Sequence, residues 1–159
     1  MLRFGVADWL LEVLQRLTAD TQQYELQYGL ALMMNLTLHK LGQKLFSRAK
    51  IDVLLVLKKH FESIQEIQLE TCLNGTIYCL MSVPMMKERA RKMGLREFLA
   101  ERFRASENQQ VKTQIDHIFD KMDEEDEEIW QQNHRRGQHQ FVIAEEEAEL
   151  DDDNNVDGL

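Results

Sequence analysis

The sequence is poor in the residues that punctuate turns. Its 159 residues include one proline and seven glycines, which argues against a fold built from many strands and turns. Leu, Met, Gln, Glu, Lys and Ala dominate instead, and these residue types favour helices. The length corresponds to about one domain and is sufficient to bury a core. The composition therefore predicts an all-helical protein.

Cysteine is scarce, and long apolar runs are absent. Cys72 and Cys79 lie two turns apart on one face of a predicted helix, too far apart to form a disulfide within it, so a reducing compartment is expected. No apolar run reaches the roughly 20 residues needed to span a bilayer. Asp8 and Glu12 interrupt the apolar N-terminal stretch, which is therefore not typical of a signal peptide. These features predict a cytoplasmic protein without a membrane span.

Signatures of catalysis and of metal binding are also missing. The sequence contains no Gly-rich phosphate loop, no Cys-x-x-Cys pair and no His-Glu-x-x-His motif. His134 and His139 flank "RRG" in a polar stretch and form only a weak candidate for a metal site. We identify no catalytic, cofactor-binding or metal-ligating residue, and we expect a non-enzymatic protein without a cofactor or small-molecule substrate.

Negative charge is concentrated in the C-terminal quarter. The net charge is −9, and two acidic runs contribute most of it, "DEEDEE" at Asp123–Glu128 and "EEEAELDDD" at Glu145–Asp153. Such a segment repels nucleic acid and anionic lipid. We expect residues 123–159 to form a largely disordered, solvated tail; attraction of a basic partner is the alternative. Residues 1–122 form the predicted folded domain.

A unit of a short, a medium and a long helix repeats along that domain. "DWLLEVL" at Asp8 matches "DVLLVL" at Asp52 with an offset of 44, and an offset of 42 carries Ile77 onto Phe119. A period of this length is typical of armadillo or HEAT arrays, and a short leading helix preceded by a glycine favours armadillo. The sequence predicts a right-handed, all-α, armadillo-like solenoid of about three repeats, in which Gly42 ends the first long helix.

The long helices are apolar over most of their circumference, because each would pack on its own repeat and on both neighbours. Small residues at Gly29, Ala31 and Gly75 are expected where neighbouring helices approach closely. The predicted core consists of large apolar side chains at repeat-equivalent positions: Leu32, Leu36, Leu54, Leu55, Ile77, Leu80, Phe98 and Phe119.

One amide interrupts the apolar stretch "GLALMMNLTLHK" at Gly29–Lys40. In armadillo arrays the third helices line a concave groove, and an asparagine at this position bonds the backbone of an extended peptide. Asn35 has that position, whereas its counterparts, Cys79 and Lys121, break the ladder. The alternative is that Asn35 bonds a neighbouring helix or loop. Helical spacing predicts these groove-facing residues: Tyr28, Asn35, His39, Thr71, Gln114, His117 and Lys121.

Three segments carry a more specific resemblance: "YELQYGLALMMNLTLHKLGQKLFSRA", "IQLETCLNGTIYCLMSVPMMKERARKMGLREFL" and the acidic run after "IDHIFDKM". From Tyr24 to about Glu128 the chain resembles the C-terminal armadillo region of the family of LisH-domain-containing armadillo-repeat protein nine, a ciliary basal-body family. The LisH motif and the coiled coil of that family are not among these 159 residues, so we expect a fragment of a longer protein or a truncated relative. Dimerisation through LisH is not carried over.

The resemblance implies a protein-interaction scaffold that supports cilium assembly and stability and Hedgehog signalling. It also implies a location at the basal body or centriole of the cytoskeleton, and partners among other ciliary or centriolar proteins. Two alternatives remain open at this point: an adaptor that binds tubulin or microtubules, and a generic cytosolic armadillo module that binds peptides.

Overall fold

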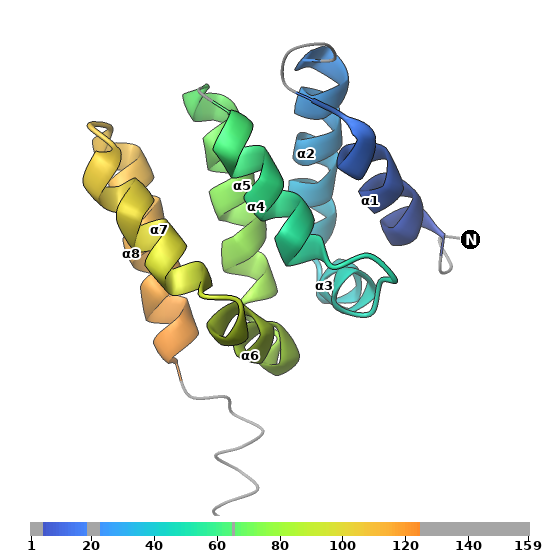
Figure 1. The fold of residues 1–159 in the computed structure, drawn as a ribbon. Coiled ribbons are helices and arrows are strands. Elements are labelled where there is room, and N and C mark those ends of the chain that lie inside the picture. The colour runs from blue at the N-terminus through green and yellow to red at the C-terminus, as the bar shows by residue number, and fades with distance from the viewer. Residues whose placement is uncertain (1–4, 19–22, 65, 125–159) are drawn as a thin grey trace, which may run out of the picture. The chain divides into compact units, whose positions relative to one another are not determined.

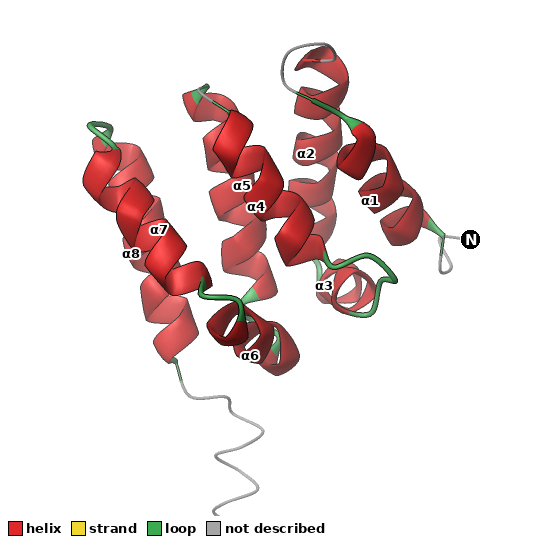
Figure 2. Cartoon of the chain, viewed as in Figure 1, coloured by secondary structure: helices red, strands yellow, loops and turns green. Residues whose placement is uncertain are grey.

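The computed structural model describes residues 5–18, 23–64 and 66–124. Within these ranges the backbone forms helices joined by short loops and contains no strand (Figure 2), which confirms the predicted all-α class. The predicted tail lies almost wholly outside the described residues. The helices are α1 (Val6–Arg16), α2 (Gln23–Thr37), α3 (Lys40–Ser47), α4 (Val53–Ser63), α5 (Ile67–Leu80), α6 (Pro84–Lys92), α7 (Leu95–Ala105) and α8 (Gln109–Asp123).

The helices follow the predicted order of short, medium and long elements. The medium helices α1, α4 and α7 lie over the long helices α2, α5 and α8, and the short helices α3 and α6 lie together at one end (Figure 1). The long helices pack in sequence, with α5 between α2 and α8. The first repeat contributes α1 and α2, and the next two contribute α3–α5 and α6–α8. This arrangement is the expected armadillo-like solenoid of about three repeats.

Local sequence signals set several helix ends. Pro84 occupies the first turn of α6, where its missing N–H costs no hydrogen bond. Gly94 has a left-handed backbone (φ 68°, ψ 33°) between α6 and α7, a conformation that favours glycine. Asp52 caps α4 by accepting a hydrogen bond from the backbone N–H of Leu54 (2.9 Å). Pro84 and Gly94 therefore mark the starts of α6 and α7.

The prediction for Gly42 is wrong. The first long helix ends at Thr37, and Gly42 is a buried residue inside α3. A Cβ atom at Gly42 would lie 1.9 Å from the carbonyl oxygen of Leu36. The glycine therefore allows the start of α3 to approach the end of α2, rather than ending the long helix.

The repeat register also differs from the expected one. Each long helix buries four positions with the same spacing: Leu26, Leu30, Met33 and Thr37 on α2, Leu69, Leu73, Thr76 and Leu80 on α5, and Val111, Ile115, Ile118 and Met122 on α8. These sets are offset by 43 and then 42 residues, so the expected first offset of 44 is one residue too long. The structural counterparts of Asn35 are therefore Tyr78 and Asp120, instead of Cys79 and Lys121.

The medium helices show a larger error of the same kind. They begin at residues 6, 53 and 95, so the first two are offset by 47 residues rather than 44. Asp52 precedes α4 as its N-cap, whereas Asp8 lies within the first turn of α1. The match between "DWLLEVL" and "DVLLVL" therefore joins positions that are not equivalent.

The core prediction is partly confirmed. Leu54, Ile77 and Leu80 are fully buried. Leu32 and Leu55 are wrong, because they are 42% and 58% exposed, and Leu36, Phe98 and Phe119 are only half-buried. One residue turns a helix by about 100°, so a register error of one exchanges a core position for its partly exposed neighbour. Met33 is the buried neighbour of Leu32, and Leu55 lies between buried Leu54 and Val56.

Side chains from one repeat bond carbonyls at the end of the preceding medium helix. His60 Nε2 lies 2.8 Å from the carbonyl oxygen of Leu14, and Arg102 Nη1 donates to the carbonyl oxygen of Phe61 (2.9 Å). Arg102 also forms an ion pair with Glu70 (2.8 Å). These bonds satisfy carbonyls that have no partner within their own helix and connect successive repeats.

No helix in the described ranges is long and apolar enough to cross a membrane.

Candidate partner-binding surface

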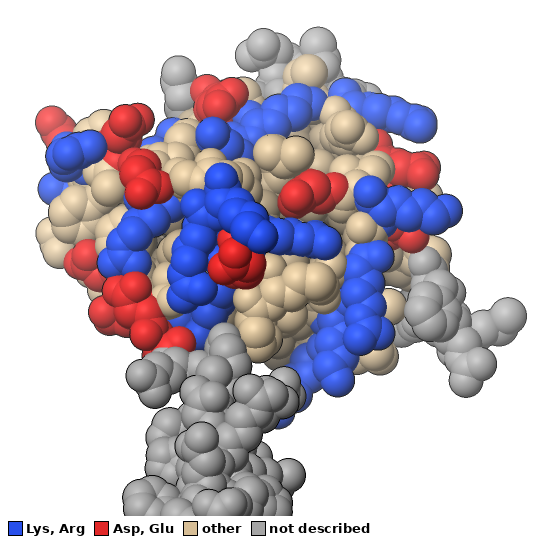
Figure 3. Space-filling view, turned by 60° about the horizontal axis from the view of Figure 1, so that its bottom comes forward, with Lys and Arg blue, Asp and Glu red and all other residues tan. Residues whose placement is uncertain are grey.

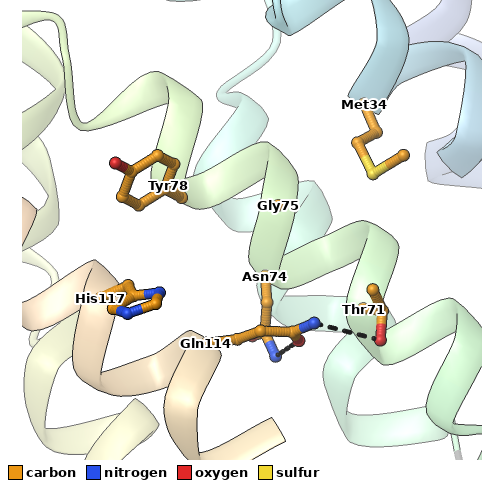
Figure 4. A pocket seen from close by; sticks show the side chains of 7 residues that line it. All are labelled: Met34, Thr71, Asn74, Gly75, Tyr78, Gln114 and His117. Atoms are coloured by element: carbon orange, nitrogen blue, oxygen red, sulfur yellow. Dashed lines mark hydrogen bonds between the residues drawn. The ribbon is translucent and has the colours of Figure 1, made fainter. Parts of the chain in front are cut away.

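A hollow of about 220 Å³ opens on the long helices, across the middle of α5. Helix α2 contributes one wall and α8 the other (Figure 4). The lining combines apolar, hydroxyl, amide and imidazole groups: Met34, Thr71, Asn74, Gly75, Tyr78, Gln114 and His117.

Gly75 lies at the centre of α5 and presents no side chain to the hollow. The nearest side-chain atom to a Cβ placed there would be Met34 Sδ, at 3.1 Å. In Figure 4, Met34 reaches from α2 on one side, and Gln114 and His117 stand on α8 on the other. Gly75 therefore does lie where neighbouring helices approach, as the sequence predicts, and it also lines the hollow.

Asn74 forms the polar floor of the hollow. Its side chain is 1% exposed, and its Nδ2 donates to Gln114 Oε1 (3.1 Å). Gln114 Nε2 in turn donates weakly to Thr71 Oγ1 (3.5 Å) (Figure 4). Asn74 Oδ1 is buried and has no hydrogen-bond partner in the described part of the chain. Because a buried acceptor without a partner costs free energy, this oxygen marks an unmet bonding capacity.

Three of the seven predicted groove residues, Thr71, Gln114 and His117, come together in this hollow. Tyr28 and Asn35 are exposed on α2 outside the lining. His39, the N-cap residue of α3, lines a second cavity of about 190 Å³ between α1, α2 and α3, and Lys121 is half-buried on α8. A role in partner binding stays a prediction for all seven residues.

Sequence reasoning missed Met34, Asn74 and Tyr78 as lining residues and assigned Gly75 to helix packing alone. Asn74 belongs to an "NGT" triplet, which is easily dismissed as a spurious glycosylation signal inside an apolar helix. The spacing of buried positions could have found Tyr78, because an offset of 43 places Tyr78, not Cys79, in line with Asn35.

The chemistry of the described residues does not point to a reactive centre. Cys72 is buried and Cys79 is half-buried, and both thiols are free. Burial raises the pKa of each thiol above its ordinary value, which disfavours the reactive thiolate. No group of three or more potential metal ligands occurs within the described ranges, and the histidine pair flanking "RRG" lies outside them.

Basic side chains gather at the end of the repeats where the short helices lie. Figure 3 shows Lys and Arg spread over this face, with Asp and Glu between them. Helix α3 carries exposed Lys40 and Lys44 and contains no acidic residue. On α6, Glu88 pairs with Arg91 and Lys92 at 3.8 and 3.2 Å. Helix α3 therefore has no acidic residue to pair with its lysines, whereas α6 has one acidic residue beside four basic ones.

Comparison with known proteins identifies one family. The family model described as "LisH domain-containing protein ARMC9, ARM repeats" matches residues 1–123. The LisH domain-containing protein ARMC9 of Xenopus tropicalis is 32% identical over 126 residues, which cover 79% of this chain and 15% of that protein. The human protein is 30% identical with the same coverage, and the Danio rerio protein is 30% identical over 119 residues, or 75% and 14%. The chain thus spans about 15% of the length of the human relative. No solved structure matches.

Proposed function

The chain belongs to the family of LisH domain-containing protein ARMC9, whose ARM-repeat model matches residues 1–123, and we propose that it is a non-enzymatic protein-interaction scaffold of the cilium and basal body. Its partners would be other ciliary or centriolar proteins. Its role would be to support cilium assembly and stability and Hedgehog signalling. Family membership and the armadillo-like architecture support this proposal, because stacked helical repeats present extended surfaces for binding proteins.

The hollow across α5 is the observation that supports the surface of the long helices as the binding site for a partner. It combines an open apolar wall with polar groups at fixed positions, as ligand-binding sites do. Exposed Tyr28 and Asn35 extend the same helix layer beyond the hollow. A partner segment that crosses α2, α5 and α8 would contact these residues together with His117.

The test is a double variant, Asn35→Ala with His117→Glu, in the full chain. Both side chains are exposed, so we expect unchanged circular dichroism and melting temperature. Recruitment to basal bodies, and capture of ciliary proteins in pull-downs, should fall. The control is Gln15→Ala with Ala105→Glu, which makes the same kinds of change at exposed positions of α1 and α7. A folded test variant that is recruited as well as the control would refute this surface.

Loss of stability on Asn35→Ala alone would also count against the proposal, because it would assign the amide a structural role. Localisation separates the scaffold from a generic cytosolic peptide-binding module, which would show no enrichment at basal bodies. Hydrolase assays on the purified chain address the non-enzymatic part of the proposal, and turnover above that of a denatured control would contradict it.

The uncompensated basic residues of α3 favour a second candidate, an adaptor that binds acidic tubulin tails. The chain as a whole is acidic, so its net charge opposes such an encounter, and the local charge of Lys40 and Lys44 would have to dominate. Co-sedimentation with microtubules at low and moderate salt tests this candidate. Lys40→Glu with Lys44→Glu should abolish pelleting at low salt, and pelleting that resists both salt and substitution would contradict an electrostatic contact.

A further inference from the structure

We propose that the hollow over Gly75 receives the side-chain amide of a glutamine in an extended partner segment, which replaces the Gln114 amide as the partner of Asn74. This inference rests on the proposed function, in which the long-helix surface binds proteins, and it names the chemical group that one position of the partner would supply.

The bonding state of Asn74 identifies an amide as the complementary group. Asn74 now uses only its Nδ2 group, toward Gln114 Oε1, and leaves the buried Oδ1 without a partner. A second primary amide that faces Asn74 edge to edge can accept from Nδ2 and donate to Oδ1 at the same time, because donor and acceptor lie on one carbon. Such a pair satisfies both groups of Asn74, whereas Gln114 satisfies one.

Gln114 is placed to give way to an incoming amide. Its side chain is half-buried and lies across Asn74 toward Thr71 (Figure 4). The bond that holds its far end, from Nε2 to Thr71 Oγ1, is 3.5 Å long and correspondingly weak. Rotation of this flexible side chain toward solvent would uncover Asn74 and leave the Thr71 hydroxyl as a further bonding group.

The lining favours a neutral side chain over an ionised one. None of the seven lining residues is a carboxylate, a lysine or an arginine, so a cation would find no counter-charge there and an anion would find only the His117 imidazole. The oxygen of Asn74 also repels a carboxylate. Met34 and Tyr78, on either side of the bare backbone of Gly75, offer apolar surface to a stem of two methylene groups. A glutamine side chain combines that stem with the required amide.

The experiment uses the full 15N-labelled chain and N-acetylglutamine N-methylamide as the probe. For a ligand of this size we expect a dissociation constant on the order of 1 mM. The probe should shift the backbone amide signals of Thr71 and Gly75 and the side-chain NH2 signals of Asn74 and Gln114. The matched glutamate derivative has nearly the same shape, and the leucine derivative is a shorter apolar analogue; both lack the amide, so we expect about tenfold weaker binding. Equal binding of all three probes would overturn the inference.

Two variants locate the site. Gly75→Ala places a methyl group in the hollow and should remove the response, while the melting temperature stays the same or rises, because alanine favours helix over glycine. Gln114→Ala removes the competing amide, so the glutamine probe should bind as well as before or more tightly. Retained binding in Gly75→Ala, or loss of binding in Gln114→Ala, would refute the proposed exchange of amides.

The test of the amide site and the test of the scaffold function can fail independently of each other. If the glutamine probe fails while Asn35→Ala with His117→Glu still impairs partner capture, the amide site is wrong and the partner-binding surface stands. If the probe binds selectively while capture is insensitive to that double variant, the amide site stands and the assignment of this surface to the scaffold function falls.

Discussion

Replacement of Gly42 by alanine tests the closest backbone approach among the described glycines. A Cβ atom there would lie 1.9 Å from the carbonyl oxygen of Leu36 and 2.6 Å from its carbonyl carbon. Both contacts are with backbone, so rotation of a side chain cannot relieve them. The start of α3 must move away from the end of α2 by about 1 Å or more before an ordinary contact distance is restored.

The cost can be worked out from the bonds at this junction. The backbone N–H of His39 donates to the Leu36 oxygen (3.3 Å), and Gln43 Nε2 donates to the Thr37 oxygen (2.9 Å). Overpacking costs about 1–3 kcal/mol, and a strained or lost hydrogen bond adds about 1 kcal/mol. Alanine returns about 1 kcal/mol through its higher helix propensity. We therefore expect Gly42→Ala to lower the free energy of unfolding by about 1–3 kcal/mol.

Thermal unfolding of three glycine variants checks this reasoning. A loss of that size corresponds to a fall of roughly 3–10 °C in melting temperature for a chain of this length. Gly75→Ala is the matched control, because its Cβ meets only the mobile end of Met34, and Gly29→Ala, with Leu14 Cδ2 at 2.8 Å, should lie between them. A Gly42→Ala variant as stable as the control would show that α2 and α3 do not approach as closely as the structure indicates.

Three further predictions concern the core and the contacts between repeats. Leu80→Ala should cost about 2–5 kcal/mol in urea unfolding, and Leu36→Ala clearly less because Leu36 is half-buried; equal losses would contradict the register. Burial lowers the pKa of His60 from its ordinary 6.5, so its neutral form is favoured in the folded chain and stability should fall as the pH drops below about 6.5. His60→Leu should flatten that dependence, and an unchanged slope would exclude His60 as its cause. Arg102→Met should lower the free energy of unfolding by about 2–3 kcal/mol, because the Phe61 carbonyl and the largely buried Glu70 carboxylate both lose their partner; an unchanged urea midpoint would show that these contacts contribute little.

The sequence by itself determined the helical class, the order of short, medium and long helices, and several of their ends. These features depend on local chemistry: the 3.6-residue period of apolar side chains, the fixed backbone of Pro84 and the left-handed conformation available to Gly94. The same period predicted that Thr71 on α5 and Gln114 and His117 on α8 face one groove, and the structure does bring the three together.

Only the tertiary structure decided the register of the repeats and the composition of the hollow. Adjacent apolar pairs such as Met33 and Met34, or Leu54 and Leu55, allow a helix to be aligned one residue too early or too late, and packing against the neighbouring helix decides which member is buried. Asn74 is a buried floor residue because α8 supplies Gln114 across it, and Gly42 is confined because α3 turns back onto the end of α2. Both facts depend on residues that folding brings together, and a local sequence pattern does not show which residues these are.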